Sequence, residues 1–501
     1  MLHTFKFSHR GELRYYLFES ENGSLLEIER PVFLYLKNGN GELTQEEKAE
    51  LDSLDGAVVK EIADELNELK ERGIIGVEEE RIDIKKSGFI KSLCLNVCHD
   101  CNLRCAYCFA AQGTYETENG KQNAESATCN KGGTAREKGN SESLSCGKNE
   151  REKSEPADEK TKYKNADEKY MSLPTAKAAV DFLVKASGPR RNLEIDFFGG
   201  EPLMNFGVVK AVVDYARQKC KENGKNIAFT MTTNALLLNK KTAGYLDENM
   251  DNVVISIDGR REVHDALRKT AGGAGSFDRV LKNALEFRDI RGEKKYYVRG
   301  TYTGRNPDFG EDVLFLNDCG FDRISVEPVV LPEDDPLALR LSDAEKIKSE
   351  YERFASEYLE RRKTAKRFDF FHFMIDLDKG PCVYKRLNGC GAGDEYAAVT
   401  PSGDIYPCHQ FIGKPEFLMG NVIEGGGVDS AVQEKFQRST VYTKDKCGEC
   451  FAKYFCSGGC AANSVTYERD INKTNALYCA VMRKRLELSL AIRAAEKKRG
   501  G

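Results

Sequence analysis

The 501-residue chain has no excess of charge of either sign, because 76 lysines and arginines face 80 aspartates and glutamates and leave a net charge of −4. This balance argues against a general nucleic-acid binder or a protein of anionic membranes, whose surfaces are basic. No apolar run approaches the roughly 20 residues needed to cross a bilayer, and the N-terminus lacks the apolar core and cleavage site of a secretory signal. We therefore expect a cytoplasmic protein without nucleic-acid or membrane partners.

The chain also lacks the glycine signatures of nucleotide-phosphate loops, since neither G-x-x-x-x-G-K-[ST] nor G-x-G-x-x-G occurs where a strand is predicted to meet a helix. It is rich in cysteine instead, with 17 residues. Disulfide frameworks are rare in a reducing cytosol, so this number favours metal binding or catalysis. At this length two to four domains are expected, with ~100–200 residues in each.

Residues 1–85 are predicted to form a small separate module. Three β-like runs, HTFKFS, LRYYLFES and SLLEIE, precede helical patterns that end in AVVKEIADELNELKERGII, where Gly73 is expected to terminate the last helix. Three strands followed by helices are typical of a winged helix-turn-helix. A purely structural cap is the alternative interpretation of this pattern.

Residues 88–331 alternate between predicted strands and helices. The strands are short, apolar and β-branched, at residues 92–97, 193–198, 227–231, 253–257, 296–302 and 324–330. Six such units predict an α/β fold whose parallel sheet curls into a partial (β/α)6 TIM barrel. Residues 114–168 interrupt this pattern with almost no large apolar side chain, so we expect them to form a disordered insertion.

The segment CHDCNLRCAYCFAA directly follows the first predicted strand of the barrel. It places Cys101, Cys105 and Cys108 in a C-x3-C-x2-C pattern and leaves Cys98 as an expected packing residue. Functional residues of such barrels lie at the C-terminal ends of the strands. Thiolates are the usual ligands of iron–sulfur clusters, and three of them leave one iron free for a further ligand. The pattern therefore predicts a working iron–sulfur site.

This cysteine pattern, placed after the first strand of a six-stranded partial barrel, resembles the radical S-adenosylmethionine superfamily. The resemblance implies a [4Fe-4S] cluster on the three cysteines and S-adenosyl-L-methionine as the cofactor. It also implies cofactor contacts from the ends of successive strands. These candidates are Tyr107, Gly199, Gly200, Glu201, Asn234, Ser256, Asp258, Arg268 and Arg299. Glu201 is expected to receive the methionine ammonium, and the two arginines are expected to pair with the carboxylate.

A bridging region, residues 332–381, leads to a cysteine-rich region over residues 382–501. Its cysteines include Cys390, Cys408, Cys447, Cys450, Cys456, Cys460 and Cys479. The C-x2-C pair alone would also suit zinc, which is the alternative. The whole array resembles the SPASM domain of peptide-modifying radical enzymes, which holds two auxiliary [4Fe-4S] clusters. By this resemblance, one cluster is held by Cys447, Cys450, Cys456 and Cys479, and the other by Cys390, Cys408 and Cys460, which makes three clusters in all.

One position departs from the SPASM pattern, because Asp394 stands where the family carries a further cysteine. We expect one of three consequences at the cluster of Cys390, Cys408 and Cys460. Asp394 supplies a carboxylate ligand, Cys382 is recruited, or one iron stays open and binds a substrate thiolate.

The similarity extends to segments without cysteine, among them RRNLEIDFFGGEPLMNF, YYVRGTYT and ISVEPVV. These segments resemble the maturases of SCIFF peptides, of the thioether-forming ranthipeptide type. The resemblance implies an oxidoreductase that joins cysteine sulfurs of a ribosomally made, cysteine-rich precursor peptide to its backbone or side-chain carbons. It implies two partners, the peptide with its leader bound by the N-terminal module and an electron donor such as flavodoxin or ferredoxin. Nothing in the chain singles out a catalytic acid or base.

Two other functions fit the cysteines. An anaerobic sulfatase-maturing enzyme shares both arrays, but that family places an acidic residue directly after the cysteine of the G-x4-C element, where this chain has His409. A non-catalytic iron–sulfur electron carrier would need the cysteines without Gly199–Glu201, Ser256 or Asp258. The sequence therefore favours the thioether-forming enzyme.

Overall fold

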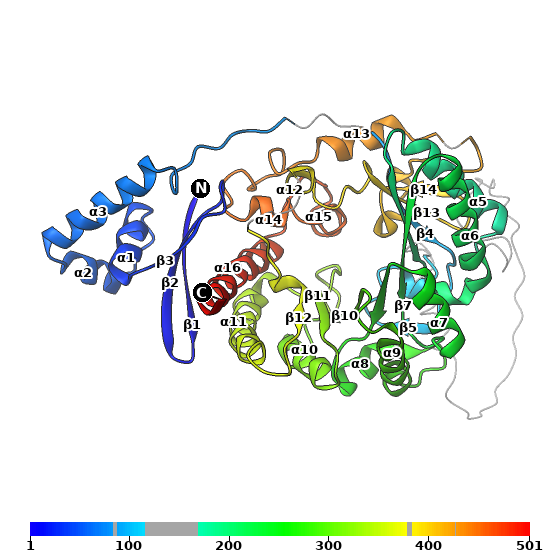
Figure 1. Ribbon diagram of the computed structural model, residues 1–501, viewed down its shortest axis with the longest axis horizontal. Coiled ribbons are helices and arrows are strands. Elements are labelled where there is room, and N and C mark those ends of the chain that lie inside the picture. Colours follow the sequence, from blue (N-terminus) through cyan, green and yellow to red (C-terminus); the bar gives the residue numbers. More distant parts are fainter. Residues whose placement is uncertain (84–87, 116–168, 378–382, 426, 501) are drawn as a thin grey trace, which may run out of the picture.

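The computed structural model describes residues 1–83, 88–115, 169–377, 383–425 and 427–500 (Figure 1). The predicted insertion at residues 114–168 lies almost wholly outside the described residues. Among those that are described, no helix combines the length and apolar character needed to cross a membrane.

The N-terminal module opens with a three-stranded antiparallel sheet and continues with three helices. The strands are β1 (Leu2–His9), β2 (Glu12–Glu19) and β3 (Leu25–Ile28), and the helices are α1 (Arg30–Gly39), α2 (Gln45–Asp52) and α3 (Gly56–Glu71). Thr44 begins α2 with a capping box, and Asp55 caps α3. Beyond α3, Gly73 has a φ of 68°, which glycine adopts without strain. The strands and the last helix lie where the sequence predicts them.

Six parallel strands form the partial barrel, each paired with the next along the chain. They are β4 (Ser92–Asn96), β6 (Asn192–Phe198), β7 (Asn226–Thr233), β8 (Asn252–Ser256), β10 (Tyr296–Tyr302) and β11 (Arg323–Pro328). The helices between them are α5 (Leu173–Ala186), α6 (Phe206–Glu222), α7 (Lys240–Asn249), α8 (Arg261–Leu267), α9 (Phe277–Arg291) and α10 (Phe309–Asp318). A short antiparallel ribbon joins β5 (Leu103–Cys105) to β9 (Arg268–Thr270). The predicted α/β partial barrel is confirmed.

The barrel sheet continues beyond both of its predicted edges. β12 (Asp369–Phe370) pairs in parallel with β11, while β13 (Tyr396–Val399) pairs in parallel with β4. β13 then leads into an antiparallel extension by β14 (Asp404–Tyr406) and β15 (Gly420–Asn421). The strand–helix alternation does end where predicted, but the cysteine-rich region shares one sheet with the barrel. β13 completes the open edge of β4 with Ala397, Ala398 and Val399, all fully buried.

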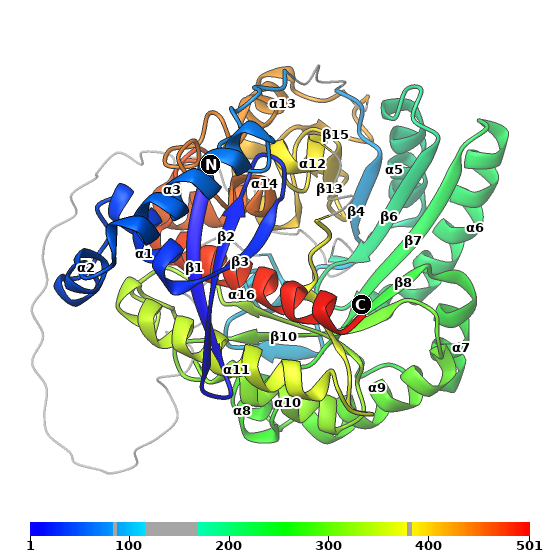
Figure 2. The same cartoon turned by 60° about the vertical axis from the view of Figure 1, so that its left-hand side comes forward.

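The remaining helices follow the last barrel strand along the chain. They are α11 (Ala344–Arg361), α12 (Val383–Asn388), α13 (Ser430–Arg438), α14 (Lys453–Cys456), α15 (Ala461–Glu468) and α16 (Ala476–Gly500). α16 packs against α11 on one side and lies beside the β1–β3 sheet on the other (Figures 1 and 2).

The N-terminal module is less separate than its sequence suggests. Phe5, Phe7, Tyr16 and Phe18 are buried in the same apolar cluster as the barrel strands and α16. These residues alternate along β1 and β2, so one face of the small sheet is aromatic and requires cover. The helices of the C-terminal region supply that cover, and the module is fixed to the rest of the chain.

Candidate functional site

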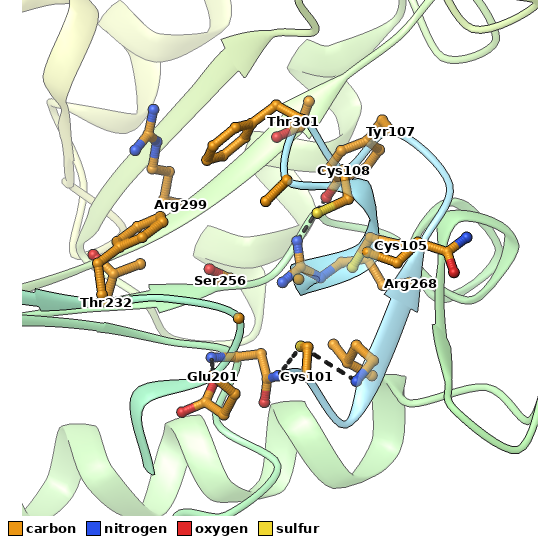
Figure 3. Close-up of a pocket in the computed structure, with 18 of the residues that line it drawn as sticks. Cys101, Cys105, Tyr107, Cys108, Glu201, Thr232, Ser256, Arg268, Arg299 and Thr301 are labelled. Carbon is orange, nitrogen blue, oxygen red and sulfur yellow. Dashed lines mark hydrogen bonds between the residues drawn. The ribbon is translucent and has the colours of Figure 1, made fainter. Parts of the chain in front are cut away.

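Three cysteines of the loop after β4 line a cavity of about 230 Å³ at the C-terminal ends of the barrel strands (Figure 3). Burial raises the pKa of the Cys101 thiol to about 12, and the neighbouring Cys105 and Cys108 raise it further. Burial also raises the pKa of Cys105 to about 11, although the charge of Arg268 opposes this shift. The β5–β9 ribbon sets Cys105 directly opposite Arg268. The predicted trio is therefore brought together in one pocket.

Most of the predicted cofactor contacts reach the same cavity. Its lining includes Tyr107, Gly199, Gly200, Glu201, Asn234, Ser256, Arg268 and Arg299. Asp258 is the exception, because it is fully buried behind the lining. The strand-end rule thus brings eight of nine candidates to the cavity wall, although what each of them binds stays a prediction.

Gly199 and Gly200 allow the loop after β6 to pack on the backbone of the cysteine loop. A Cβ atom on Gly200 would lie 2.0 Å from the carbonyl oxygen of Asp100, and one on Gly199 would lie 2.4 Å from that of Cys98. The amide of Gly200 donates to the carbonyl of Cys98 at 2.8 Å. These glycines therefore accommodate the cysteine-bearing backbone itself, which was not part of the sequence-based prediction.

The Glu201 carboxylate joins the loops that follow β6 and β7. It accepts hydrogen bonds from the hydroxyl of Thr233 at 2.7 Å and from the amides of Asn234 at 2.7 Å and Leu203 at 3.1 Å. Burial raises its pKa to about 7, against these hydrogen bonds. If the methionine ammonium binds Glu201 as predicted, it has only those carboxylate lone pairs that Thr233, Asn234 and Leu203 leave free.

Asp258 holds two sides of the cavity together. The hydroxyl of Tyr107 donates to the Asp258 carboxylate at 2.7 and 2.8 Å, and the amide of Thr301 donates to it at 3.1 Å. Arg268 in turn donates to the oxygen of Tyr107 at 2.6 Å, and its Nη1 lies 3.6 Å from Asp258. The structure thus places Asp258 as a support for Tyr107 and Arg268. The Nε atom of Arg268 is buried without a hydrogen-bond partner among the described residues.

The cavity is also lined by residues that the sequence analysis did not select as cofactor contacts. Phe109, Phe198, Glu327 and His409 line it. The His409 ring lies 5.4 Å from Phe109 and 4.6 Å from Phe198, and burial lowers its pKa to about 4. Glu327 could have been found from its place at the end of the last barrel strand. His409 could not, because only the β13–β4 pairing brings it to the barrel.

Glu327 is ionised under ordinary conditions. His372 lies 3.3 Å away and Arg485 3.6 Å away. Burial acts to raise the pKa of Glu327, whereas His372, Arg485 and Arg299 lower it. Because burial lowers the pKa of His372 itself to about 3, the two arginines supply the positive charge beside Glu327. A negative charge on the cavity wall is therefore balanced by the neighbouring arginines.

The other cysteines lie near one another in two places, and their roles as cluster ligands stay predictions. Burial raises the pKa of Cys408, and the neighbouring thiols of Cys460 and Cys390 raise it further. In the second group, burial raises the pKa of Cys456 to about 12, and three nearby thiols add to the shift, those of Cys479, Cys447 and Cys450. Lys444 lies near both groups, and its Nζ donates to the carbonyl of Ile471 at 2.6 Å.

Asp394 does not face the cysteine group of Cys390, Cys408 and Cys460 with a free carboxylate. Gln437 donates to its Oδ1 at 2.8 Å, and the hydroxyl of Tyr384 donates to its Oδ2. This arrangement disfavours the carboxylate ligand among the three expected consequences. Cys382 lies outside the described residues.

Cys98 is the packing residue that the sequence predicts. It is fully buried, and its thiol donates to the carbonyls of Glu201 at 3.0 Å and Asp100 at 3.4 Å. It thereby fastens the loop after β6 to the cysteine loop, together with the glycine contacts. Cys129 and Cys146, in the predicted insertion, lie outside the described residues.

The donor sets fit iron–sulfur chemistry. Each consists of three or four thiols, the usual ligands of such clusters, and coordination removes the protons that burial would otherwise hold on them. The unpaired Nε of Arg268 at the cavity wall suits an anionic ligand group. Within the described chain, no three His, Cys, Asp or Glu residues are grouped closely enough to hold a single metal ion. The ligand assignments stay predictions.

Comparisons with known proteins agree with this site. A family model described as a 4Fe-4S single cluster domain matches residues 90–281. An uncharacterised protein of Methanocaldococcus jannaschii is 34% identical over 166 residues, which cover 32% of this chain and 54% of that protein. The cysteine-type anaerobic sulfatase-maturating enzyme of Clostridium novyi is 24% identical over 287 residues, which cover 54% of this chain and 74% of the enzyme. The chain thus spans about half the length of the first of these relatives.

The fold is also similar to a solved structure, that of anSMEcpe with bound AdoMet and the Kp18Cys peptide. The TM-score is 0.58 at 17% sequence identity, and the match covers 81% of this chain and 99% of that one. At this identity the likeness concerns the fold. The comparisons thus show a match to a 4Fe-4S cluster domain over residues 90–281 and a fold similar to that of this solved structure.

Proposed function

We propose that this protein is a radical S-adenosylmethionine maturase that forms thioether crosslinks in a cysteine-rich precursor peptide. The observation that carries the proposal is the position of the cavity. Cys101, Cys105 and Cys108 line one part of it, and His409, directly after Cys408, lines another. A peptide residue held there lies between two cysteine groups of different predicted roles.

The proposed cofactor site uses the first group and its surroundings. A cluster on the three thiolates, with bound S-adenosylmethionine, supplies the 5′-deoxyadenosyl radical that removes a hydrogen atom from the peptide. Arg268, supported by Asp258 through Tyr107, is proposed to orient the cofactor carboxylate. Phe109 and Phe198 are proposed to give the cavity an apolar wall.

The two auxiliary groups are proposed to hold one [4Fe-4S] cluster each, on the ligand sets that the sequence predicts. Formation of a thioether removes two hydrogen atoms from the peptide: one from the acceptor carbon and one from the thiol. One electron of this oxidation is proposed to leave through an auxiliary cluster towards a flavodoxin- or ferredoxin-like protein. The hydrogen bonds of Asp394 argue against a carboxylate ligand at the set of Cys390, Cys408 and Cys460, which leaves Cys382 or a substrate thiolate as the further ligand.

The N-terminal module is proposed to bind the peptide leader. Within the described chain β3 pairs only with β2, so its other edge offers backbone groups to an added strand. Strand addition of this kind gives affinity through main-chain hydrogen bonds. The alternative, a module that serves only as a structural cap, has weaker support. Such a cap would not need a free strand edge.

A sulfatase-maturing activity is the second candidate, favoured by the similarity to the Clostridium novyi enzyme. Against it stands His409, where that family carries an acidic residue. Burial holds the His409 ring neutral, since its pKa falls to about 4. This chain therefore has an uncharged imidazole at the position where the sulfatase-maturing family has a carboxylate, so the charge of this part of the cavity wall differs between the two.

Anaerobic incubation of the iron-loaded protein with S-adenosylmethionine and dithionite tests the proposal first. Release of 5′-deoxyadenosine is expected, and its absence would exclude radical enzymes of this type in favour of an electron carrier. Co-expression with a short cysteine-rich peptide encoded beside the gene is the second step. Mass spectrometry should then show a loss of two hydrogens for each crosslink. A product containing formylglycine would establish the second candidate instead.

A further inference from the structure

The five residues between Cys450 and Cys456 form one part of the surface that contacts the N-terminal module, besides α11 and α16. His3 stacks on Phe451 with ring centroids 3.5 Å apart and planes inclined by 4°. The ring of Phe18 meets that of Phe455 edge-on at 5.8 Å. Both contacts come from the sheet of the module, and both partners belong to one short segment that two predicted cluster ligands enclose.

Lys453 is the centre of this contact. Its side chain is only 1% exposed, and its Nζ lies 3.3 Å from Glu21 and 3.0 Å from Glu79. Glu21 belongs to the turn between β2 and β3, whereas Glu79 follows α3. The hydroxyl of Tyr454 donates to Glu79 at 3.1 Å. Both carboxylates that pair with this lysine in the described chain thus come from the module.

A buried lysine with these partners ties two parts of the chain to each other. Removal of its carboxylates would leave a charge in an apolar place, which is strongly unfavourable. The position of Lys453 is in turn set by α14 (Lys453–Cys456), whose last residue is a predicted ligand. The amide of Lys453 also donates to the carbonyl of Cys450 at 3.1 Å. The predicted ligands Cys450 and Cys456 therefore fix the position of the Lys453 ammonium, which pairs with the two carboxylates of the module.

We propose that metal loading of the set Cys447, Cys450, Cys456 and Cys479 and seating of the N-terminal module are energetically coupled, with Lys453 as the positioning residue. The proposal rests on the cluster assignment of the proposed function. A cluster on this set fixes both ends of residues 451–455, and the ordered segment then holds the module. Because coupling between two sites is reciprocal, a seated module also favours the loaded set. The consequence is that only chains with this set loaded present the module in its peptide-binding position.

Hydrogen exchange on the full-length chain tests the coupling without peptide or S-adenosylmethionine. In the wild-type protein, loss of iron from this set should speed amide exchange in β1–β3 by about tenfold, within the usual range of coupling factors. Cys479→Ser, which removes one predicted ligand of the set, should give the same acceleration. Cys101→Ser, which removes a ligand of the barrel cluster, should leave the module unchanged. Exchange in β7 serves as the internal reference for folding.

Substitutions at the contact complete the test. Lys453→Met should give fast exchange in β1–β3 whether iron is present or not, and Lys453→Arg should restore most of the protection. Lys37→Met is the matched control, because Lys37 pairs with Glu47 inside the module at 3.2 Å. If Lys453→Met also speeds exchange in β7, the variant is destabilised as a whole, and Glu79→Gln is used instead as the milder change. Its exchange in β1–β3 should lie between that of the wild type and that of Lys453→Met.

Two results would overturn the coupling: equal exchange of β1–β3 in Cys479→Ser and wild type, or iron-dependent protection that survives in Lys453→Met. The outcome is independent of catalysis. A coupled protein that never releases 5′-deoxyadenosine would refute the proposed function and keep this inference. If the enzyme releases 5′-deoxyadenosine but exchange in β1–β3 does not depend on iron in this cysteine set, the coupling is refuted and the proposed function stands.

Discussion

Asp258 joins Tyr107, Thr301 and Arg268 from a position that is itself closed to the cavity. Its two oxygens accept from the phenol and from the backbone amide, and its charge balances the guanidinium. Hydrogen bonds to an ionised acceptor are about twice as strong as neutral ones. The carboxylate therefore fixes the direction in which Arg268 presents its charge.

Asp258→Asn should weaken S-adenosylmethionine binding by about 10- to 100-fold, the usual effect of losing a supporting carboxylate behind a functional site. Iron loading of the three cysteines should stay within error of the wild-type value. Anaerobic equilibrium dialysis with the cofactor measures the first quantity, and iron analysis measures the second.

Asp312→Asn is the matched control for this change. Asp312 is as deeply buried and pairs with Arg260 at 2.8 Å, but its hydrogen-bond donors, Arg260 and Asn306, do not line the cavity, whereas Tyr107 and Thr301 beside Asp258 do. Its loss should lower stability and leave cofactor affinity within about twofold, since supporting effects are local. Equal affinities of the two variants would contradict the role of Asp258.

At the scale of elements, two loops meet where the ends of β4 and β6 lie side by side. Gly200→Ala should displace the cysteine loop, because its Cβ would lie 2.0 Å from a backbone oxygen that cannot move aside. Such overpacking costs about 1–3 kcal/mol of stability. We expect less iron on the barrel site and a loss of 5′-deoxyadenosine release, measured by iron analysis and chromatography.

Gly207→Ala offers the comparison, because a Cβ at Gly207 meets nothing within 4 Å and the residue lies in α6. This change should be neutral or stabilise the chain by up to about 1 kcal/mol. A normal iron content in Gly200→Ala would show that the loop tolerates the displacement.

The barrel strands could be predicted because each is a short apolar run bounded by turn residues. The site of the barrel cysteines could be predicted because their spacing is itself the signal, whereas the two sets of C-terminal cysteines were expected from the resemblance to SPASM domains. The junction of β13 with β4 could not, since Ala397 and Ala398 carry no local sign of their partner strand. The same long-range pairing hid His409. The sequence also carried no sign that Asp258 lies behind the cavity or that Glu201 is already hydrogen-bonded, because burial depends on the assembled loops.

At the scale of the whole molecule, the N-terminal module and the barrel share one apolar core. Deletion of residues 1–80 should expose the surface of α11 and α16 that covers Phe5 and Phe18. We expect a lower melting temperature and increased binding of an apolar dye, because buried apolar area is the main stabilising contribution. Differential scanning calorimetry and dye fluorescence measure these effects.

The same deletion should weaken binding of the leader and leave uncoupled cofactor cleavage in the chains that stay folded. 5′-Deoxyadenosine release therefore reports the folded fraction in this experiment. Unchanged melting and no dye binding would show that the module is separable after all. Full crosslinking of an intact precursor would show that it does not bind the leader.

The pairing of β4 with β13 has a consequence for synthesis of the protein. About 300 residues separate the two strands, so β4 emerges from the ribosome long before its neighbour exists. Pairings between such distant segments form slowly, and an unpaired strand edge attracts other chains in the meantime. The nascent barrel thus stays open on the side of the cysteine loop until β13 has been synthesised.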